Sequence, residues 1–103
     1  MAYSIGIWMT RHSTNIVVYR WESDRGGQSR AGFVVLDLRE QSVCPSTPEG
    51  QPLGDMTLTA RVGRCEGLTP DVDTGLFIQI ASSILRRIDT DGAPPRTAHR
   101  VYG

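Results

Sequence analysis

The chain has 103 residues, 39% hydrophobic and 21% charged, and its eleven arginines balance eleven acidic residues to a formal net charge of zero. This length and composition predict one compact domain that folds without metal or disulfide bonds. Neutrality removes the long-range field of nonspecific nucleic-acid binders, which argues against nucleic acid as a partner. The chain has neither an apolar run of about 20 residues nor the features of a signal peptide, so we expect a cytoplasmic protein without a membrane partner.

The first part of the chain predicts three strands. Residues 3–10 alternate between apolar and polar side chains, and residues 15–22 contain the β-branched and aromatic run IVVYRW. The tight turn between these segments favours a hairpin. A glycine-containing loop follows, and residues 31–38 (AGFVVLDL) predict the third strand.

A long loop and a fourth strand come next. Residues 39–55 contain three prolines and two glycines, which predicts a surface loop with room only for a short strand around Val43. Residues 56–64 alternate cleanly again, with Met56, Leu58, Ala60 and Val62 expected to point inward. This segment predicts the fourth strand.

One amphipathic helix is predicted after the strands. Thr69 suits the N-cap, Pro70 suits the first helical position, and Asp71 and Asp73 place negative charge in the first turn. Gly92 is expected to end the helix. Apolar residues recur at steps of three and four and predict one buried stripe: Val72, Leu76, Phe77, Ile80, Ala81, Ile84, Leu85 and Ile88.

The predicted fold class is α+β. Its two layers are a four-stranded, mainly antiparallel sheet and one long C-terminal amphipathic helix (ββββα). Residues 1–92 form the single compact domain in this prediction. Residues 93–103 form a proline-containing tail that docks either on the domain or on a partner. This order of elements occurs in folds with unrelated activities, so it does not by itself predict a function.

The tripeptide Asp73-Thr74-Gly75 matches the one that carries the catalytic carboxylate of aspartic proteases. In those enzymes the aspartate lies in a loop after a strand, whereas here it precedes an apolar helical stripe. A pair of carboxylates would also need a symmetric dimer. We therefore predict that Asp73 is a structural residue of the first helical turn.

Other candidate sites have equally ordinary explanations. Cys44 and Cys65 are too few for a zinc site, and the loop starting at Asp89 has Arg100 where a calcium loop needs an acid. No metal or cofactor is expected. Both thiols are predicted to be free, because a hairpin around the long loop would hold them apart. A small enzyme or ligand binder using Cys44, His99 or Asp73 stays open as an alternative.

The predicted sheet carries apolar side chains on both faces, and one helix can cover only one of them. The helix is expected to cover Ile5, Ile7, Val18, Val34, Leu36, Leu58 and Val62. Large aromatic side chains on the other face would form a partner surface, unless the tail or the long loop folds over it. The predicted interface is Trp8, Val17, Tyr19, Trp21, Phe33 and Val35.

These observations favour a non-catalytic protein-interaction module, such as a regulator, an accessory subunit or an immunity-type inhibitor. Its partner would be another protein, or a second copy in a homodimer. The alternative is single-stranded nucleic-acid binding, with bases stacked on the aromatic side chains and arginines contacting phosphates.

Overall fold

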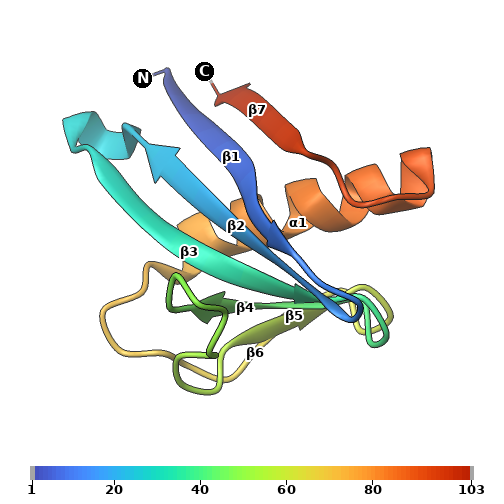
Figure 1. The fold of residues 1–103 in the computed structure, drawn as a ribbon. Coiled ribbons are helices and arrows are strands. Elements are labelled where there is room, and N and C mark those ends of the chain that lie inside the picture. The colour runs from blue at the N-terminus through green and yellow to red at the C-terminus, as the bar shows by residue number, and fades with distance from the viewer. Residues whose placement is uncertain (1, 103) are drawn as a thin grey trace.

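The computed structural model describes residues 2–102 as an α+β fold, with one antiparallel sheet and one helix lying across it (Figure 1). The sheet has seven strands in the order β6-β5-β4-β3-β2-β1-β7. The strands are β1 (Tyr3–His12), β2 (Ile16–Ser23), β3 (Arg30–Asp37), β4 (Ser42–Ser46), β5 (Thr57–Thr59), β6 (Cys65–Glu66) and β7 (Thr97–Tyr102). A 3-10 turn, η1 (Arg25–Gly27), joins β2 to β3, and the helix α1 (Thr74–Asp91) precedes β7.

The prediction of four strands is wrong, because the sheet has seven. The loop segment 39–55 contributes β4, which pairs with β3, and the tail contributes β7. Of the expected fourth strand over residues 56–64, only Thr57–Thr59 form a strand, β5. The chain turns after Thr59, and Gly63 has a φ of 75°. Met56 and Leu58 are buried as expected, whereas Val62 is exposed.

The helix begins four residues later than the capping pattern predicted. Asp73 is the N-cap, and its side chain accepts a hydrogen bond from the N–H of Leu76 at 3.1 Å. Thr69 instead donates its hydroxyl proton to the carbonyl of Leu53 at 2.6 Å. Asp71 has a φ of 65°, a left-handed conformation that a helix cannot contain. The helix ends at Gly92, as predicted, with a φ of 77°.

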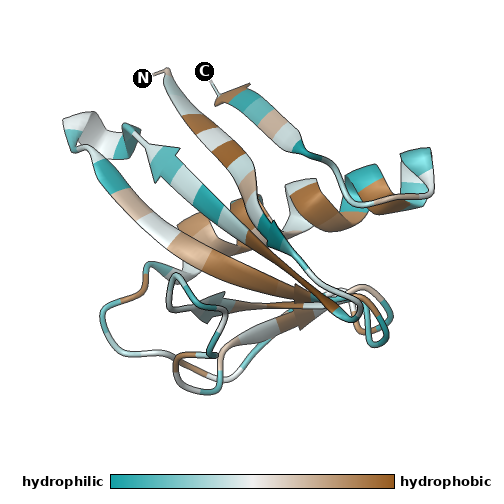
Figure 2. Ribbon diagram, in the orientation of Figure 1, coloured by the Kyte–Doolittle hydropathy of each residue, from teal (hydrophilic) through white to brown (hydrophobic). Residues whose placement is uncertain are grey.

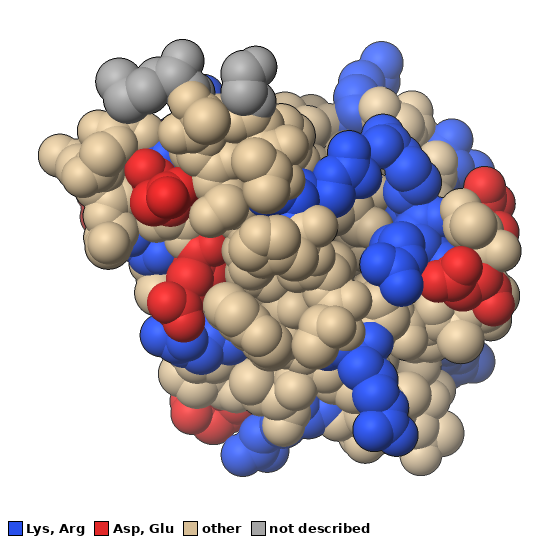
Figure 3. All heavy atoms as spheres, turned by 90° about the horizontal axis from the view of Figure 1, so that it is seen from above, with Lys and Arg blue, Asp and Glu red and all other residues tan. Residues whose placement is uncertain are grey.

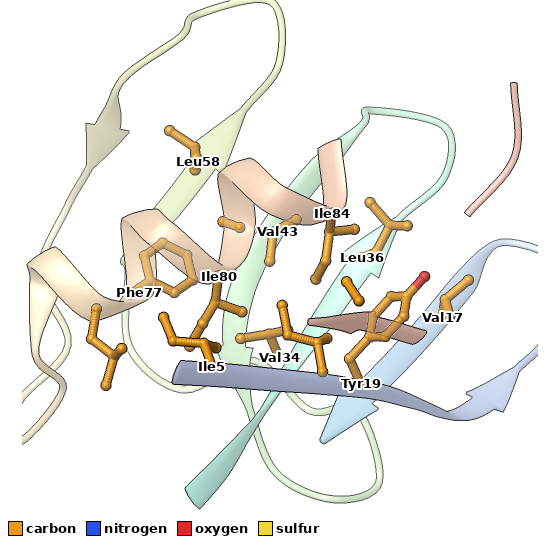
Figure 4. Packing of buried hydrophobic residues seen from close by; sticks show 14 of the residues in the cluster. Ile5, Val17, Tyr19, Val34, Leu36, Val43, Leu58, Phe77, Ile80 and Ile84 are labelled. Atoms are coloured by element: carbon orange, nitrogen blue, oxygen red, sulfur yellow. The ribbon is translucent and has the colours of Figure 1, made fainter. Parts of the chain in front are cut away.

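The core lies between α1 and the central strands, where the ribbon is most hydrophobic (Figure 2). Phe77, Ile80 and Ile84 point from α1 toward the sheet, onto side chains of β1 to β5 (Figure 4). This packing fixes which face of each strand is buried. The strand residues of the core are Ile5, Ile7, Val17, Tyr19, Val34, Leu36, Val43, Leu58 and Ala98.

The predicted face of β2 is wrong, and a β-bulge explains why. Near the hairpin turn Arg11 pairs with Val18, but beyond a register shift between Met9 and Arg11 the pairs are Met9 with Tyr19 and Ile7 with Trp21. The one extra residue in β1 exchanges the two faces of β2 relative to β1. Val17, Tyr19 and Trp21 therefore face α1 together with Ile7, whereas Val18 faces the other side. A hairpin without the bulge would have given the expected assignment.

Residues 93–102 dock on the sheet through β7 and the segment before it. The hydroxyl of Tyr19, which is fully buried, donates a hydrogen bond to the carbonyl of Pro95 at 2.7 Å. From there β7 runs antiparallel to β1, with Trp8 opposite Thr97 and Tyr3 opposite Tyr102. The first and last strands of the chain thus lie side by side (Figure 1).

The corrected face of β2 leads to a stability prediction for the two tryptophans. Trp21 packs against the core under α1, whereas Trp8 is 41% exposed on the other face. We expect Trp21→Ser to lower the free energy of unfolding by about 2 kcal/mol, because it removes a large, partly buried side chain. Trp8→Ser should cost less than about 1 kcal/mol. Urea unfolding of both variants measures the difference, and equal losses would contradict the assignment.

Candidate functional site

The six residues predicted to form one interface lie in different environments. Trp8, Phe33 and Val35 are on the sheet face opposite α1, as predicted. Val17 and Tyr19 are core residues, and Trp21 packs against the core from the helix side. The structure therefore brings only the first three to the same face. Whether any of them contacts a partner stays a prediction.

The turn after β4 covers part of the face opposite α1. At Gly50, where φ is 92°, an added Cβ would lie 2.9 Å from Val18 Cγ2 and 3.8 Å from Val35 Cγ2. Val18 and Val35 are buried beneath this turn. The long loop therefore covers the part of this face that β2 and β3 form, which was the alternative to a partner surface.

Trp8 is the large aromatic side chain that stays exposed on this face. Its indole ring lies on Gly6 of the same strand, since a Cβ at Gly6 would come within 2.5 Å of Trp8 Cη2. Gly6, Trp8, Glu22 and His99 line a shallow depression of about 230 Å³. The ion pair between Arg20 and Glu22 borders it on β2. The ring is thus held flat, with its outer surface free and polar groups beside it.

The edge formed by β7 is the second feature of this region. The N–H of Met9 donates to the carbonyl of Arg96 at 2.8 Å, and that of Asp24 donates to the carbonyl of Ser4. Antiparallel strands alternate their bonding partners, so Ala98, Arg100 and Tyr102 direct their backbone groups toward β1. The backbone N–H and C=O groups of Thr97, His99 and Val101 consequently point away from the sheet.

The charges near this edge are positive. Residues 2–21 and 92–102 contain no aspartate or glutamate, but they include arginine at four positions: Arg11, Arg20, Arg96 and Arg100. The nearest acids on this face are Glu22 and Asp24, two strands inward from β7; Glu22 is paired with Arg20, and Asp24 Oδ1 accepts a hydrogen bond from the N–H of Ser4. In the view onto the end of the molecule that carries the two termini, arginine atoms gather over the half that holds the C-terminal end of α1, with acidic atoms beside them at the margin (Figure 3).

Asp73 is the N-cap of α1 and also forms ion pairs with two arginines. Arg30 Nη1 lies 3.2 Å from Asp73 Oδ2, and Arg25 Nη1 lies 3.7 Å from Oδ1. The N–H of Leu76, followed by these two arginines, holds the pKa of Asp73 below its ordinary value, against an opposing effect of burial. A carboxylate held ionised in this way suits capping and charge pairing better than proton transfer.

The candidate thiol and imidazole groups lie apart. Cys44 is on β4, and burial raises its pKa. His99 is on β7, four strand spacings of about 4.8 Å away, or roughly 19 Å. Cys44 and Cys65 are both free, and Cys65 faces the helix side beside Leu58. The structure does not bring Cys44 and His99 together as a nucleophile and its base.

A cavity of about 390 Å³ opens between the start of α1 and strands β3 and β4. Trp21 forms one wall and lies on Gly32, where an added Cβ would be 2.8 Å from Trp21 Cζ2. Val72 and Phe77 contribute apolar surface, and Asp73 carries charge into the lining. This size and character suit a small, mostly apolar ligand.

Within residues 2–102 no three histidine, cysteine or acidic side chains gather closely enough to hold a metal ion. Nor does the described chain contain a helix with the length and apolar character that crossing a membrane requires.

Comparison of the chain with protein-family models, curated proteins and solved structures finds no match.

The sequence predicted that Trp8 lies on the face opposite α1, but it did not predict the edge formed by β7. The signal available was weak: the β-favouring residues Thr97, Val101 and Tyr102 all lie within the seven residues that follow Pro94 and Pro95. Nothing local to these residues indicates that they end the sheet, because strand order is set by contacts distant in sequence.

Asp73 gives a prediction that separates capping from charge. Asp73→Ala should lower the free energy of unfolding by about 1 kcal/mol, whereas Asp73→Asn, which can still cap, should cost less. Because the folded-state pKa is lowered, the charge contribution is present above the unfolded pKa of about 4 and is lost as the pH falls through the folded value. Thermal unfolding of both variants from neutral to acid pH tests this. A larger loss for Asp73→Asn than for Asp73→Ala would contradict the capping role.

The cysteines give a second prediction. Titration under denaturing, nonreducing conditions should detect both thiols, Cys44 and Cys65. The folded protein should react more slowly, because burial raises the pKa of both thiols and less of the reactive thiolate is present. A count of zero in freshly purified monomer would show that the two pair with each other.

Proposed function

We propose that the protein is a non-catalytic protein-interaction module, such as a regulator, an accessory subunit or an immunity-type inhibitor. It binds through the uncovered sheet face around Trp8 and the adjoining edge of β7. The observation that carries this proposal is Trp8 itself, a tryptophan 41% exposed and held flat on Gly6 in β1, on the sheet face that α1 does not cover.

The surroundings of Trp8 resemble the usual make-up of an interface. Tryptophan is enriched at interface hot spots, where a ring fixed in advance loses little conformational entropy on binding. Arg20, Glu22 and His99 place polar groups around it. An apolar centre inside a polar rim is the common arrangement of protein–protein contacts.

A binding role is also supported by the separation of the reactive groups. Cys44 and His99 lie on β4 and β7, and Asp73 is engaged by Leu76 and two arginines. A thiol or acid catalyst would need a base or a second acid within hydrogen-bond distance.

The cavity beside Trp21 favours a second candidate function, the binding of a small apolar ligand. Its volume of about 390 Å³ is within the range of ligand pockets. It lies on the helix side of the sheet, so this function and protein binding at Trp8 involve different surfaces.

Single-stranded nucleic-acid binding is the less favoured alternative. Base stacking on a sheet needs several exposed aromatic rings on one face. Tyr19 and Trp21 face α1, and Tyr3 and Tyr102 stack on each other with their centroids 5.0 Å apart. Trp8 and the half-buried Phe33 are the aromatic residues placed on the uncovered face.

The test replaces Trp8 and compares it with a matched exposed residue. Trp8→Ser should abolish association, either self-association in sedimentation or copurification of a stoichiometric partner from the native host. Leu68→Ser is the control, because Leu68 is 76% exposed in a different part of the chain. Both variants should unfold within about 1 kcal/mol of the parent protein.

The proposal fails if association survives Trp8→Ser unchanged. It also fails if the parent protein stays monomeric at high concentration and copurifies with nothing. Saturable binding of an apolar probe that Trp21→Ser removes, without any protein association, would support the second candidate instead.

A further inference from the structure

The two edges of the sheet differ in their capacity to pair with another strand. The β6 edge has two residues, Cys65 and Glu66, and turns lie on both sides of it. The β7 edge runs for six residues, Thr97–Tyr102, without a proline or a bulge. Its outward backbone groups at Thr97, His99 and Val101 are spaced as in any antiparallel ladder. A long regular edge of this kind is a template for strand addition.

We propose that β7 binds an extended acidic segment of a partner protein, which adds to the sheet as an eighth strand. This inference rests on the proposed interaction function and assigns it a binding mode and a class of partner. Main-chain hydrogen bonds to the edge supply affinity, and alternate side chains of the added strand supply specificity.

Charge complementarity determines the acidic character of the segment. Arg96 precedes β7 and Arg100 lies on it, and Arg11 lies near the end of β1, with no acid in residues 2–21 or 92–102. An acidic side chain opposite Arg100 would form a favourable cross-strand pair. The positive edge also attracts such a segment before contact.

A second copy of the chain fits this edge less well. If two β7 strands paired antiparallel around a twofold axis at His99, Arg100 of one copy would lie opposite Ala98 and diagonal to Arg96 and Arg100 of the other. Diagonal neighbours are within reach of long side chains, so these arginines would repel one another across the interface. The charges therefore favour a different chain over a homodimer.

Nucleic acid also fits the edge less well than a peptide. Phosphate oxygens accept hydrogen bonds but donate none, so they would leave the outward carbonyl groups of Thr97, His99 and Val101 without partners. A peptide strand supplies a donor for each carbonyl and an acceptor for each N–H.

The two sides of β7 predict the pattern of the added strand. Thr97, His99 and Val101 lie on the same face as Trp8, and Val101 is 69% exposed. Ala98, Arg100 and Tyr102 lie on the α1 side. A segment that alternates apolar and acidic residues would place its apolar side chains beside Val101, on the face that carries Trp8, and its acidic side chains beside Arg100.

The experiment titrates the isotope-labelled full chain with defined probes and follows the amide signals by NMR. The probes are a peptide of about ten residues that alternates glutamate and valine, its lysine–valine counterpart, and an oligothymidylate of about ten nucleotides, each up to about 1 mM. The acidic peptide should shift the amides of Thr97, His99 and Val101, and the lysine peptide should not.

Two variants test the backbone and the charge separately. His99→Pro removes one outward N–H and keeps the bonds of β7 to β1, so it should weaken binding about tenfold or more while the fold is retained. Arg100→Glu should weaken binding about fivefold or more. Arg61→Glu is the matched control, because it makes the same charge change at an exposed position beyond β5 and should leave binding unchanged.

Several outcomes would overturn the inference. These are no shift at β7 with any peptide, equal binding of the acidic and lysine peptides, or oligothymidylate binding that His99→Pro does not alter. A concentration-dependent dimer that His99→Pro dissociates would assign the edge to a second copy. If His99→Pro does not fold, comparing the peptide affinity of Arg100→Glu with that of Arg61→Glu still shows whether binding requires the charge of Arg100.

This test separates the inference from the proposed function. If Trp8→Ser abolishes partner association while His99→Pro and Arg100→Glu do not, the interaction function holds and the edge mode is wrong. If neither Trp8→Ser nor the edge variants alter any association, both are wrong.

Discussion

Packing of one helix against one face of the sheet is the constraint on which the rest of the structure depends. Leu76, Phe77, Ile80, Ala81 and Ile84 of α1 bury the inner side chains of the central strands. A single helix of 18 residues cannot reach the other face or the outer edges. The protein covers part of the remaining surface with the turn at Gly50, and leaves the region around Trp8 and β7 uncovered. The candidate interaction surface is therefore the part of the sheet that neither α1 nor the turn at Gly50 covers.

Local sequence patterns predicted those parts of the fold that depend on local physics. Residues in β1 alternate and those in α1 recur with the correct period, and Gly92 ends the helix as a glycine in the left-handed region does. The face of β2 could not be predicted, because IVVYRW is apolar at consecutive positions and its phase depends on a bulge in the neighbouring strand. Similarly, the helix starts at Asp73 because Asp71 adopts a left-handed conformation that a capping pattern does not reveal.

The candidate site was less predictable than the fold. The face of Trp8 could be predicted because side chains in β1 alternate, which puts Trp8 on the face that Ile5 and Ile7 do not occupy. The edge of β7 could not, because an edge is defined by which strands are outermost, and that order follows from contacts between distant segments. The Tyr19 hydroxyl, buried with its bond to Pro95, is such a contact. No pattern in either local sequence indicates the other.

The pairing of the last strand with the first also has a consequence for the order of folding. β1, β2 and β3 are joined by short turns, whereas β7 reaches β1 only after almost the whole chain has been ordered. Closing so long a loop costs more backbone entropy than forming either hairpin, so β7 should be added late, once Tyr19 is in place to receive Pro95. In the folded protein the same strand should be among the first to detach, since a six-residue edge has a partner on one side alone. A strand added to the free side of β7 would therefore also oppose its detachment from β1.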